Sequence, residues 1–220
     1  MLNTPLSGHR RSVALAVAAA LLTAVLCRPA LAADADPEAR YQTLLAAAKA
    51  GSQPVDWQAL RFAYADRPSF SLQSTEYAEL RKQMFLALGA QDWEKTLSVS
   101  RQMIEKNFVD PEAHLVAAIC DLKLKRSDDG FRERDISNGL LRSIETGDGL
   151  TKATALTVIS VDEEYAYLRL KGLRPIRQSL IKEGGHGYDL LDTKDVKGQP
   201  RPVYFQIDRV LAAEMKMFQH

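Results

Sequence analysis

The spacing of apolar side chains along the chain changes near Gly147. Before that residue they recur every three or four positions, which is the spacing of one face of an α-helix. After it they alternate with polar residues or form short β-branched runs, as in strands. Helices followed by a sheet that they cover make an α+β fold. The pattern therefore predicts N-terminal helical hairpins packed with a small C-terminal antiparallel sheet and a terminal helix.

Local signals divide the first part of the chain into helices. Asp56 can cap a short helix in which Trp57, Leu60 and Tyr64 share one face, and the segment 67–69, with its proline, ends it. Further helices are expected over 37–50, 74–88, from Asp92 to about 108, 111–124 and 131–144, the last of them ended by the glycines of 147–149.

The second part shows strand patterns around one helix. Strands are expected over 156–161, 176–182, 188–193 and 203–207, with a glycine-rich hairpin loop over 183–187. After the first strand, Asp162 is predicted to cap a helix whose first turn holds Glu163 and Glu164, where carboxylates favour the helix dipole. A closing amphipathic helix is expected along Leu211, Met215 and Phe218.

Residues 1–32 have the composition of an export signal. A basic His9-Arg10-Arg11 patch precedes an uncharged apolar run over 13–26, and small residues surround Ala32. The run is shorter than the roughly 20 residues that span a membrane. We expect a signal peptide cleaved near Ala32 and a periplasmic or secreted protein, with no integral membrane span after processing. The mature chain would hold an N-terminal helix and linker over 33–55 and a single α+β domain over 56–220, with its helical part at 56–146 and its sheet part at 150–220.

The two cysteines bear on anchoring and on stability. Cys27 could be the lipidated first residue of a lipoprotein, an alternative weakened by Leu26, because a small residue normally precedes such a cysteine. Processing at Ala32 leaves Cys120 as the sole thiol, so no disulfide can form within the chain. It also removes three arginines and no acid, which leaves 26 basic and 28 acidic side chains. That balance gives no electrostatic footprint for nucleic acid.

One helical hairpin resembles a tetratricopeptide repeat. In residues 89–95 a turn is followed by an aromatic side chain and then by Glu-Lys, as in the middle of such a repeat. Pro111 falls a few residues late for that pattern, and no second copy follows. We therefore interpret residues 74–108 as one packed hairpin that resembles a single repeat.

Other elements resemble a different family. They are the strand-to-helix run TALTVISVDEEY over 154–165, DPEAH over 110–114, Tyr188-Asp189, and Tyr204-Phe205. Together they are similar to an exported bacterial family that is catalogued only as a domain of unknown function. The resemblance covers roughly residues 56–207. It implies an exported protein with no established activity or cofactor, and it transfers no functional residue to this chain.

Seven side chains are candidate functional or structural polar residues: His114, Glu163, Glu164, Tyr165, His186, Asp189 and Tyr204. The adjacent carboxylates of Glu163 and Glu164 could bind a metal or act as general acid and base, but neighbours on a helix point about 100° apart. Alternatively, one of them hydrogen-bonds a buried partner such as Tyr204 or His114, and Glu164→Gln would then cost about 1–3 kcal/mol. His186 lies in the glycine-rich loop, either as an exposed functional histidine or in an ordinary turn.

The sequence indicates no metal or cofactor. Of His114, His186 and His220, none belongs to a His-Glu-x-x-His pattern, and the glycines of 184–187 lack the Lys-Ser/Thr of a phosphate loop. Two hypotheses remain. The first is a non-catalytic protein-binding or interaction module with an envelope protein as partner, because helical hairpins often present grooves. The second is a small hydrolase-like enzyme that uses the Glu163/Glu164 and His114 region. Nothing in the sequence indicates the oligomeric state.

Overall fold

The structure is a computed structural model that describes residues 36–217 apart from 52–53 and 73. The predictions for the export signal and for Cys27, and those for His220 and Phe218, lie outside these residues. Within them, no helix is long and apolar enough to cross a membrane.

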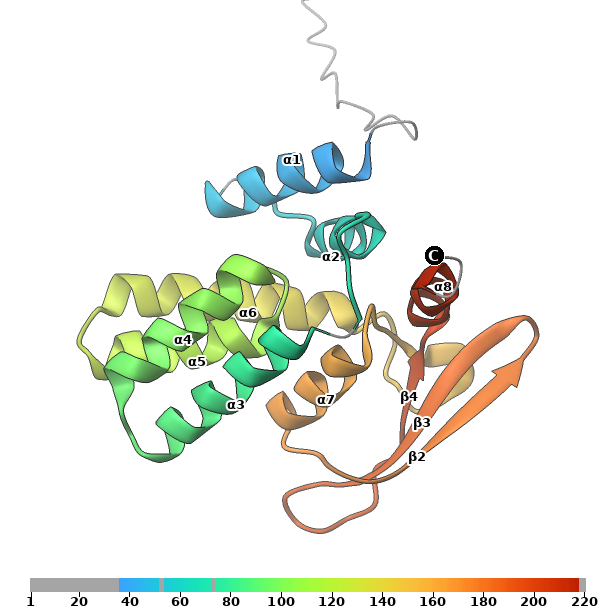
Figure 1. Cartoon of the computed structure of the whole chain (residues 1–220). Coiled ribbons are helices and arrows are strands. Elements are labelled where there is room, and N and C mark those ends of the chain that lie inside the picture. Colours follow the sequence, from blue (N-terminus) through green and yellow to red (C-terminus); the bar gives the residue numbers. More distant parts are fainter. Residues whose placement is uncertain (1–35, 52–53, 73, 218–220) are drawn as a thin grey trace, which may run out of the picture. The chain divides into compact units, whose positions relative to one another are not determined.

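The first part of the described chain is helical, as predicted (Figure 1). Its helices are α1 (Pro37–Lys49), α2 (Trp57–Asp66), α3 (Thr75–Gly89), α4 (Trp93–Lys106), α5 (Pro111–Lys123) and α6 (Ser127–Ile144). Side chains at the starts of α2 to α5 accept hydrogen bonds from the backbone of the first turn, which satisfies N–H groups that a helix leaves free. The residues that provide these caps are Asp56, Ser74, Asp92 and Asp110.

The described helices include a second hairpin, whose turn the sequence did not locate correctly. Helices α5 and α6 lie side by side after α3 and α4 (Figure 1). The turn between them places Lys125 at φ +61°, a conformation that usually requires glycine. Helix α6 begins at Ser127, four residues before its predicted start, and no side chain caps it. The local signals for this turn are therefore absent from the sequence.

The second part of the described chain combines four strands with helix α7 (Val161–Leu170), helix α8 (Asp208–Met217) and the short 3₁₀ helix η1 (Lys152–Thr154). The strands β1 (Leu156–Thr157), β2 (Arg174–Glu183), β3 (His186–Lys194) and β4 (Val203–Gln206) lie in the order β1-β4-β3-β2. The α+β class is confirmed. The sheet is mixed, however, because β1 runs parallel to β4 while the other neighbours are antiparallel.

The predicted strand over 156–161 was too long, and the predicted cap of the following helix was wrong. Strand β1 ends at Thr157, and the Ser160 side chain accepts the N–H of Glu163 as the N-cap of α7. Asp162 therefore lies in the first turn of the helix, beside Glu163 and Glu164. Serine at the N-cap position is as effective as aspartate, so the two alternatives were hard to separate by composition.

Helix α7 packs on the face of the sheet that carries Leu191, Val203 and Phe205. A separate apolar cluster joins α1, α2 and α6 and reaches Ile159, just before α7. The helices therefore cover the sheet through α7. In α8, Leu211 packs against the apolar core of the sheet as predicted, whereas Met215 is 61% exposed and Val210 is buried.

Candidate functional site

His114 and Glu163 do not meet; each is bound by another partner. The His114 ring is buried, with Nδ1 2.5 Å from Glu133 and Nε2 2.8 Å from the carbonyl oxygen of Phe108. Burial alone would raise the pKa of Glu133, but the hydrogen bond to His114 and the nearby positive charges together outweigh it and lower that pKa. His114 thus joins α5 to α6. Its hydrogen bonds within the described residues do not include Glu163 or Glu164.

Glu163 forms a buried ion pair with Arg61 of α2. The guanidinium donates from Nε and Nη2 to the two carboxylate oxygens, over 2.7 and 2.6 Å. The remaining donors of Arg61 reach the Ser143 hydroxyl and the carbonyl of Thr157, and its side chain is fully buried. Glu163 also accepts the backbone N–H of Ile159. The pair therefore ties α2 to the start of α7.

Sequence reasoning missed Arg61, although the signal was present. Arg61 follows Trp57 by four residues and precedes Tyr64 by three, so it lies on the apolar face of its helix. A charged side chain on such a face is rarely buried without a partner of opposite charge. The partner, Glu163, is 102 positions away, and no local pattern could identify it.

Glu164, Tyr165 and Asp189 gather where α7 meets the sheet. The amide nitrogen of Gln178 donates to Asp189 over 2.5 Å and to Glu164 over 3.5 Å, and the Tyr165 hydroxyl donates to the amide oxygen of Gln178 over 2.9 Å. Both carboxyl groups are buried. Burial and the nearby Asp189 raise the pKa of Glu164 to about 9. At neutral pH the pair therefore shares one proton, held on Glu164.

The two remaining candidates lie elsewhere on the sheet. His186 Nδ1 is 2.7 Å from Asp208, which also accepts the N–H of Gly187, so this contact joins the β2–β3 hairpin to α8. Tyr204 alternates with Val203 and Phe205 along β4 and so points to the opposite face of the sheet from α7. We expected Glu163 or Glu164 to hydrogen-bond Tyr204 or His114. That prediction was wrong, because Glu163 binds Arg61 and Glu164 binds Gln178.

A cleft of about 360 Å³ lies where α3, α5 and α7 begin. The capping residues of these helices, Ser74, Asp110 and Ser160, all line it. Helix starts carry partial positive charge because their N–H groups point outward. Cationic side chains of Arg67, Arg81 and Lys106 also line the cleft. The carboxylates of Glu76, Asp110, Asp162 and Glu163 line it as well, and Lys106 pairs with Glu76 over 2.8 Å. The cleft therefore holds both signs of charge beside three helix starts.

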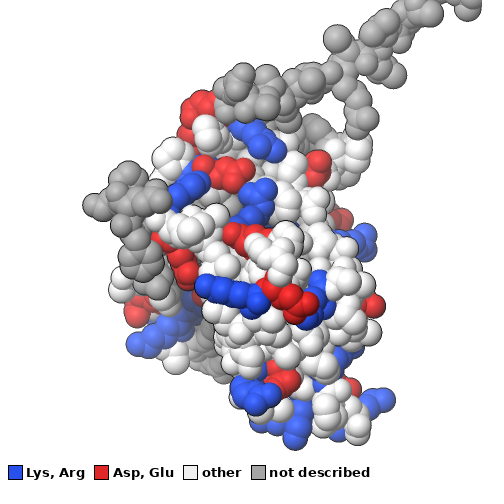
Figure 2. All heavy atoms as spheres, turned by 90° about the vertical axis from the view of Figure 1, so that its right-hand side faces the viewer, with Lys and Arg blue, Asp and Glu red and all other residues white. Residues whose placement is uncertain are grey.

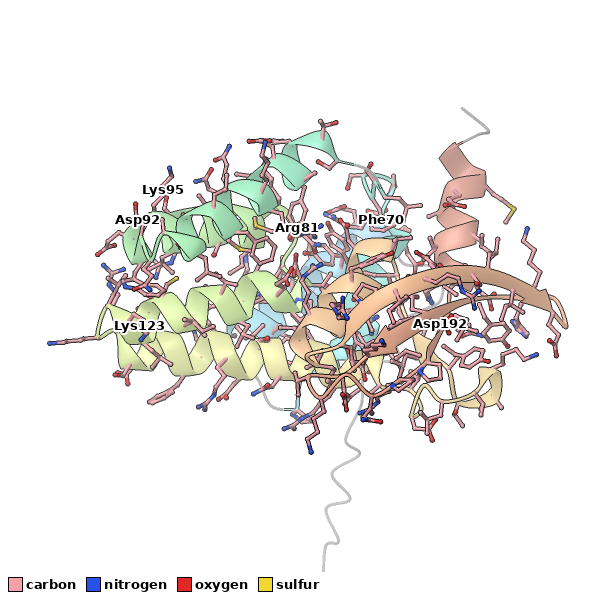
Figure 3. The ribbon with its side chains drawn as sticks, turned by 90° about the horizontal axis from the view of Figure 1, so that it is seen from below. Phe70, Arg81, Asp92, Lys95, Lys123 and Asp192 are labelled. Carbon is pink, nitrogen blue, oxygen red and sulfur yellow. The ribbon has the colours of Figure 1, made fainter. Side chains whose placement is uncertain are left out.

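Arg81 of α3 links the walls of the cleft (Figure 3). Its Nη1 lies 2.8 Å from Asp162 of α7, and its Nη2 lies 3.5 Å from Asp110 at the start of α5. Asp110 also accepts a 2.5 Å hydrogen bond from the Tyr77 hydroxyl. Burial alone would lower the pKa of Arg81, but the two carboxylates raise it. Arg81 Nε is buried and has no hydrogen-bond partner among the described residues.

Two of the elements that carried the family resemblance meet around this cleft. Asp110 belongs to the DPEAH element and Asp162 to the strand-to-helix run, and Arg81 bridges them. Further along, Arg169 of α7 donates to both oxygens of Glu112, over 2.6 and 2.7 Å. The recurring motifs are therefore brought together by arginines that sequence reasoning did not single out.

The sequence of residues 45–216 matches the family described as "Domain of unknown function (DUF4919)". The chain belongs to the DUF4919 family. The match confirms the resemblance and extends it at both ends, so that it includes the cleft and the buried ion pairs. No curated protein and no solved structure matches the chain.

On one face of this DUF4919 member, surface charge gives no second candidate site. On the face shown in Figure 2, blue and red side chains are interspersed and neither sign forms a continuous patch. Among the described residues, no three histidine, cysteine, aspartate or glutamate side chains could jointly hold a metal ion. The cleft at Arg81 is therefore the site with the strongest chemical character.

Proposed function

We propose that this chain is an exported, non-catalytic binding protein of the bacterial envelope, and that the cleft around Arg81 is where it contacts its partner. The observation that carries the proposal is the unequal use of polar side chains. His114, Glu163, Glu164 and Asp189 are buried and held by structural hydrogen bonds or ion pairs. Arg81, in contrast, lines an open cleft, where its Nη1 pairs with the half-exposed Asp162. Binding needs such a site, and catalysis needs reactive groups placed in it.

A small hydrolase is the weaker proposal. It required His114 to act with Glu163 or Glu164, and the hydrogen bonds of His114 and Glu163 engage other partners. The shared proton of Glu164 and Asp189 has the raised pKa of a general acid. Neither carboxyl lines the cleft, however, and both are buried.

Export is supported by the order of basic, apolar and small residues in 1–32. N-terminal sequencing and mass measurement of the protein from the source cells test it. The proposal expects a chain that starts at Ala33 in the soluble envelope fraction. A chain that starts at a lipid-modified Cys27 would show an anchored protein, and a chain that retains Met1 would refute export.

Site-specific photocrosslinking tests the binding role of the cleft. Benzoylphenylalanine in place of Phe70, which lines the cleft, is compared with the same probe at Phe131, which is 47% exposed on α6. Irradiation of envelope preparations should give a discrete adduct from position 70 and none from position 131. Equal crosslinking at both positions, or none at position 70, would contradict the proposal.

A further inference from the structure

The chemistry of the cleft indicates which ligand group it takes. A guanidinium offers its N–H groups as a planar fork that suits two oxygens of one anion. In Arg81 the fork is only partly used: Nη1 meets Asp162, Nη2 meets Asp110 at 3.5 Å, and Nε has no partner among the described residues. Arg61 provides the contrast, because its Nε and Nη2 hold both oxygens of Glu163. Because Nε of Arg81 is buried, an oxyanion would take the place of Asp162 at the Nη1 and Nη2 side of the guanidinium.

The acidic side chains around the cleft differ in how firmly they are held. Asp110 accepts two backbone N–H groups and the Tyr77 hydroxyl, and it is 5% exposed. Glu163 is bound by Arg61. Asp162 is different, because its side chain is 54% exposed and its ion pair is with Arg81. Exposed ion pairs are weak, so Asp162 can yield its place to another anion.

The walls of the cleft add an apolar component. Phe70, Leu72 and Val109 line it beside the cationic side chains, and the volume of about 360 Å³ suits a small ligand. Phe70 and Arg81, both labelled in Figure 3, line the same cleft. A ligand that fits both features has an oxyanion at one end and a short apolar body at the other.

We propose that the cleft is an oxyanion site, in which Arg81 binds the carboxylate or phosphate group of a small amphiphilic ligand in the place that Asp162 holds in the free protein. The inference rests on the proposed binding function and specifies the recognised group. A carboxylate would come from a free peptide C-terminus or a small acid, and a phosphate from a phosphomonoester. Asp162 then acts as an internal competitor for Arg81.

Calorimetric titration of the mature protein tests the proposal with three probes that share a phenyl ring. They are N-acetyl-phenylalanine, its C-terminal amide, and phenyl phosphate. The amide lacks the charge, so it should bind at least about tenfold more weakly than the acid. Phenyl phosphate binding more tightly than the acid would identify a phosphomonoester as the source of the oxyanion. Amide binding as tight as that of the acid would overturn the proposal.

Two variants locate the binding group. Asp162→Asn removes the competitor and should tighten acid binding by about fivefold, whereas Asp128→Asn, which removes a first-turn acid from α6, should leave it unchanged. Arg81→Gln should weaken binding by about tenfold or more, and Arg177→Gln on β2 serves as its control. Unchanged binding in Asp162→Asn would overturn the proposal even if Arg81→Gln failed to fold.

Crosslinking at position 70 and acid binding by Arg81 can fail independently of each other. A crosslink at position 70 that persists in the Arg81→Gln protein would leave the binding role standing and refute the oxyanion site. Acid binding that depends on Arg81, without any crosslink at position 70, would retain the oxyanion site and refute a macromolecular partner.

Discussion

Arg61 and Arg81 are two arginines of the same domain with opposite surroundings. Arg61 is fully buried, and each of its guanidinium nitrogens has an acceptor. Arg81 faces a cleft, pairs with an exposed aspartate, and leaves Nε unused. The first arrangement holds elements together and has no capacity left for a ligand. The comparison separates an arginine whose contacts are all internal from one whose ion-pair partner is exposed at a cleft.

The same distinction applies to the carboxyl groups. Glu163 lines the cleft but is buried and held by Arg61, and the Glu164–Asp189 pair is buried away from the cleft, whereas Asp162 is exposed. Three consecutive acids at the start of α7 therefore have three different environments. Their directions around the helix, about 100° apart, explain why.

Breaking the buried Arg61–Glu163 pair should have the largest effect on stability. Glu163→Gln leaves the Arg61 charge buried without a counterion, so the free energy of unfolding should fall by about 3–5 kcal/mol. Urea denaturation followed by circular dichroism measures the change. The matched removal of a surface partner, Asp192→Asn beside Arg177, should cost less than about 1 kcal/mol. Equal costs would mean that Arg61 and Glu163 are not closed to solvent.

The Glu164–Asp189 pair should make stability depend on pH. The pKa of Glu164 is about 9 in the folded protein, against an ordinary value of 4.5, so the folded state keeps a proton that the unfolded state releases. Stability is therefore fullest below the unfolded value and is lost as pH rises toward 9, by up to about 1.4 kcal/mol per pH unit. The free energy of unfolding from urea denaturation should therefore be lower at pH 8 than at pH 6.

Glu164→Gln is the control for this pH dependence, and here the structure changes the expectation from sequence. A glutamine resembles the protonated carboxyl and cannot ionise, so the variant should show a flatter stability profile. At pH 8 it should be at least as stable as the original protein. The sequence led us to expect a cost of about 1–3 kcal/mol for this substitution. That cost at pH 8, with an unchanged pH profile, would contradict the shared proton.

Tyr77 lines the cleft and is hydrogen-bonded to the buried Asp110. Its hydroxyl donates to Asp110 at the wall of the cleft, and Tyr77→Phe removes that bond alone. We expect a loss of about 1–2 kcal/mol, measured by thermal unfolding, because a hydrogen bond to a charged group is lost. A loss of unfolding free energy as large as that of Glu163→Gln would mean that Tyr77 and Asp110 stabilise the domain as much as the Arg61–Glu163 pair does.

Substitution of the exposed Asp162 in the cleft should affect stability least. Asp162→Asn removes an exposed ion pair, so the free energy of unfolding should change by less than about 1 kcal/mol. Differential scanning calorimetry compares it with Asp128→Asn, which removes an acid from the first turn of α6. A larger loss for Asp162→Asn would show that the domain depends on this aspartate for its stability, and that a ligand could not displace it.

Local signals were sufficient to predict much of the fold. Asp56, Asp92 and Asp110 each cap the helix predicted from the sequence, because a capping side chain acts within three residues of its own position. The parallel pairing of β1 with β4 could not be predicted, since it joins residues about 50 positions apart. The early start of α6 was also missed, because the turn before it uses Lys125 where glycine is usual.

The candidate site was less predictable, because its chemistry depends on contacts between distant segments. Glu164, Tyr165 and Asp189 were singled out from separate motifs, and Gln178, which bridges them, was not. Arg81 carries no local signal, because an arginine on an amphipathic helix is ordinary in sequence. Its importance arises where three helix starts from different parts of the described chain converge.

The most direct measurement follows the side-chain Nε–H resonances of both arginines by ¹H–¹⁵N NMR while N-acetyl-phenylalanine is added. Loss of a signal in Arg81→Lys assigns the resonance of Arg81. The account predicts that the Arg61 signal is protected from solvent exchange before addition and does not move. The Arg81 signal should shift as the acid binds. An Arg81 signal that does not respond, or an Arg61 signal that shifts as much, would contradict the distinction between the closed pair and the open cleft.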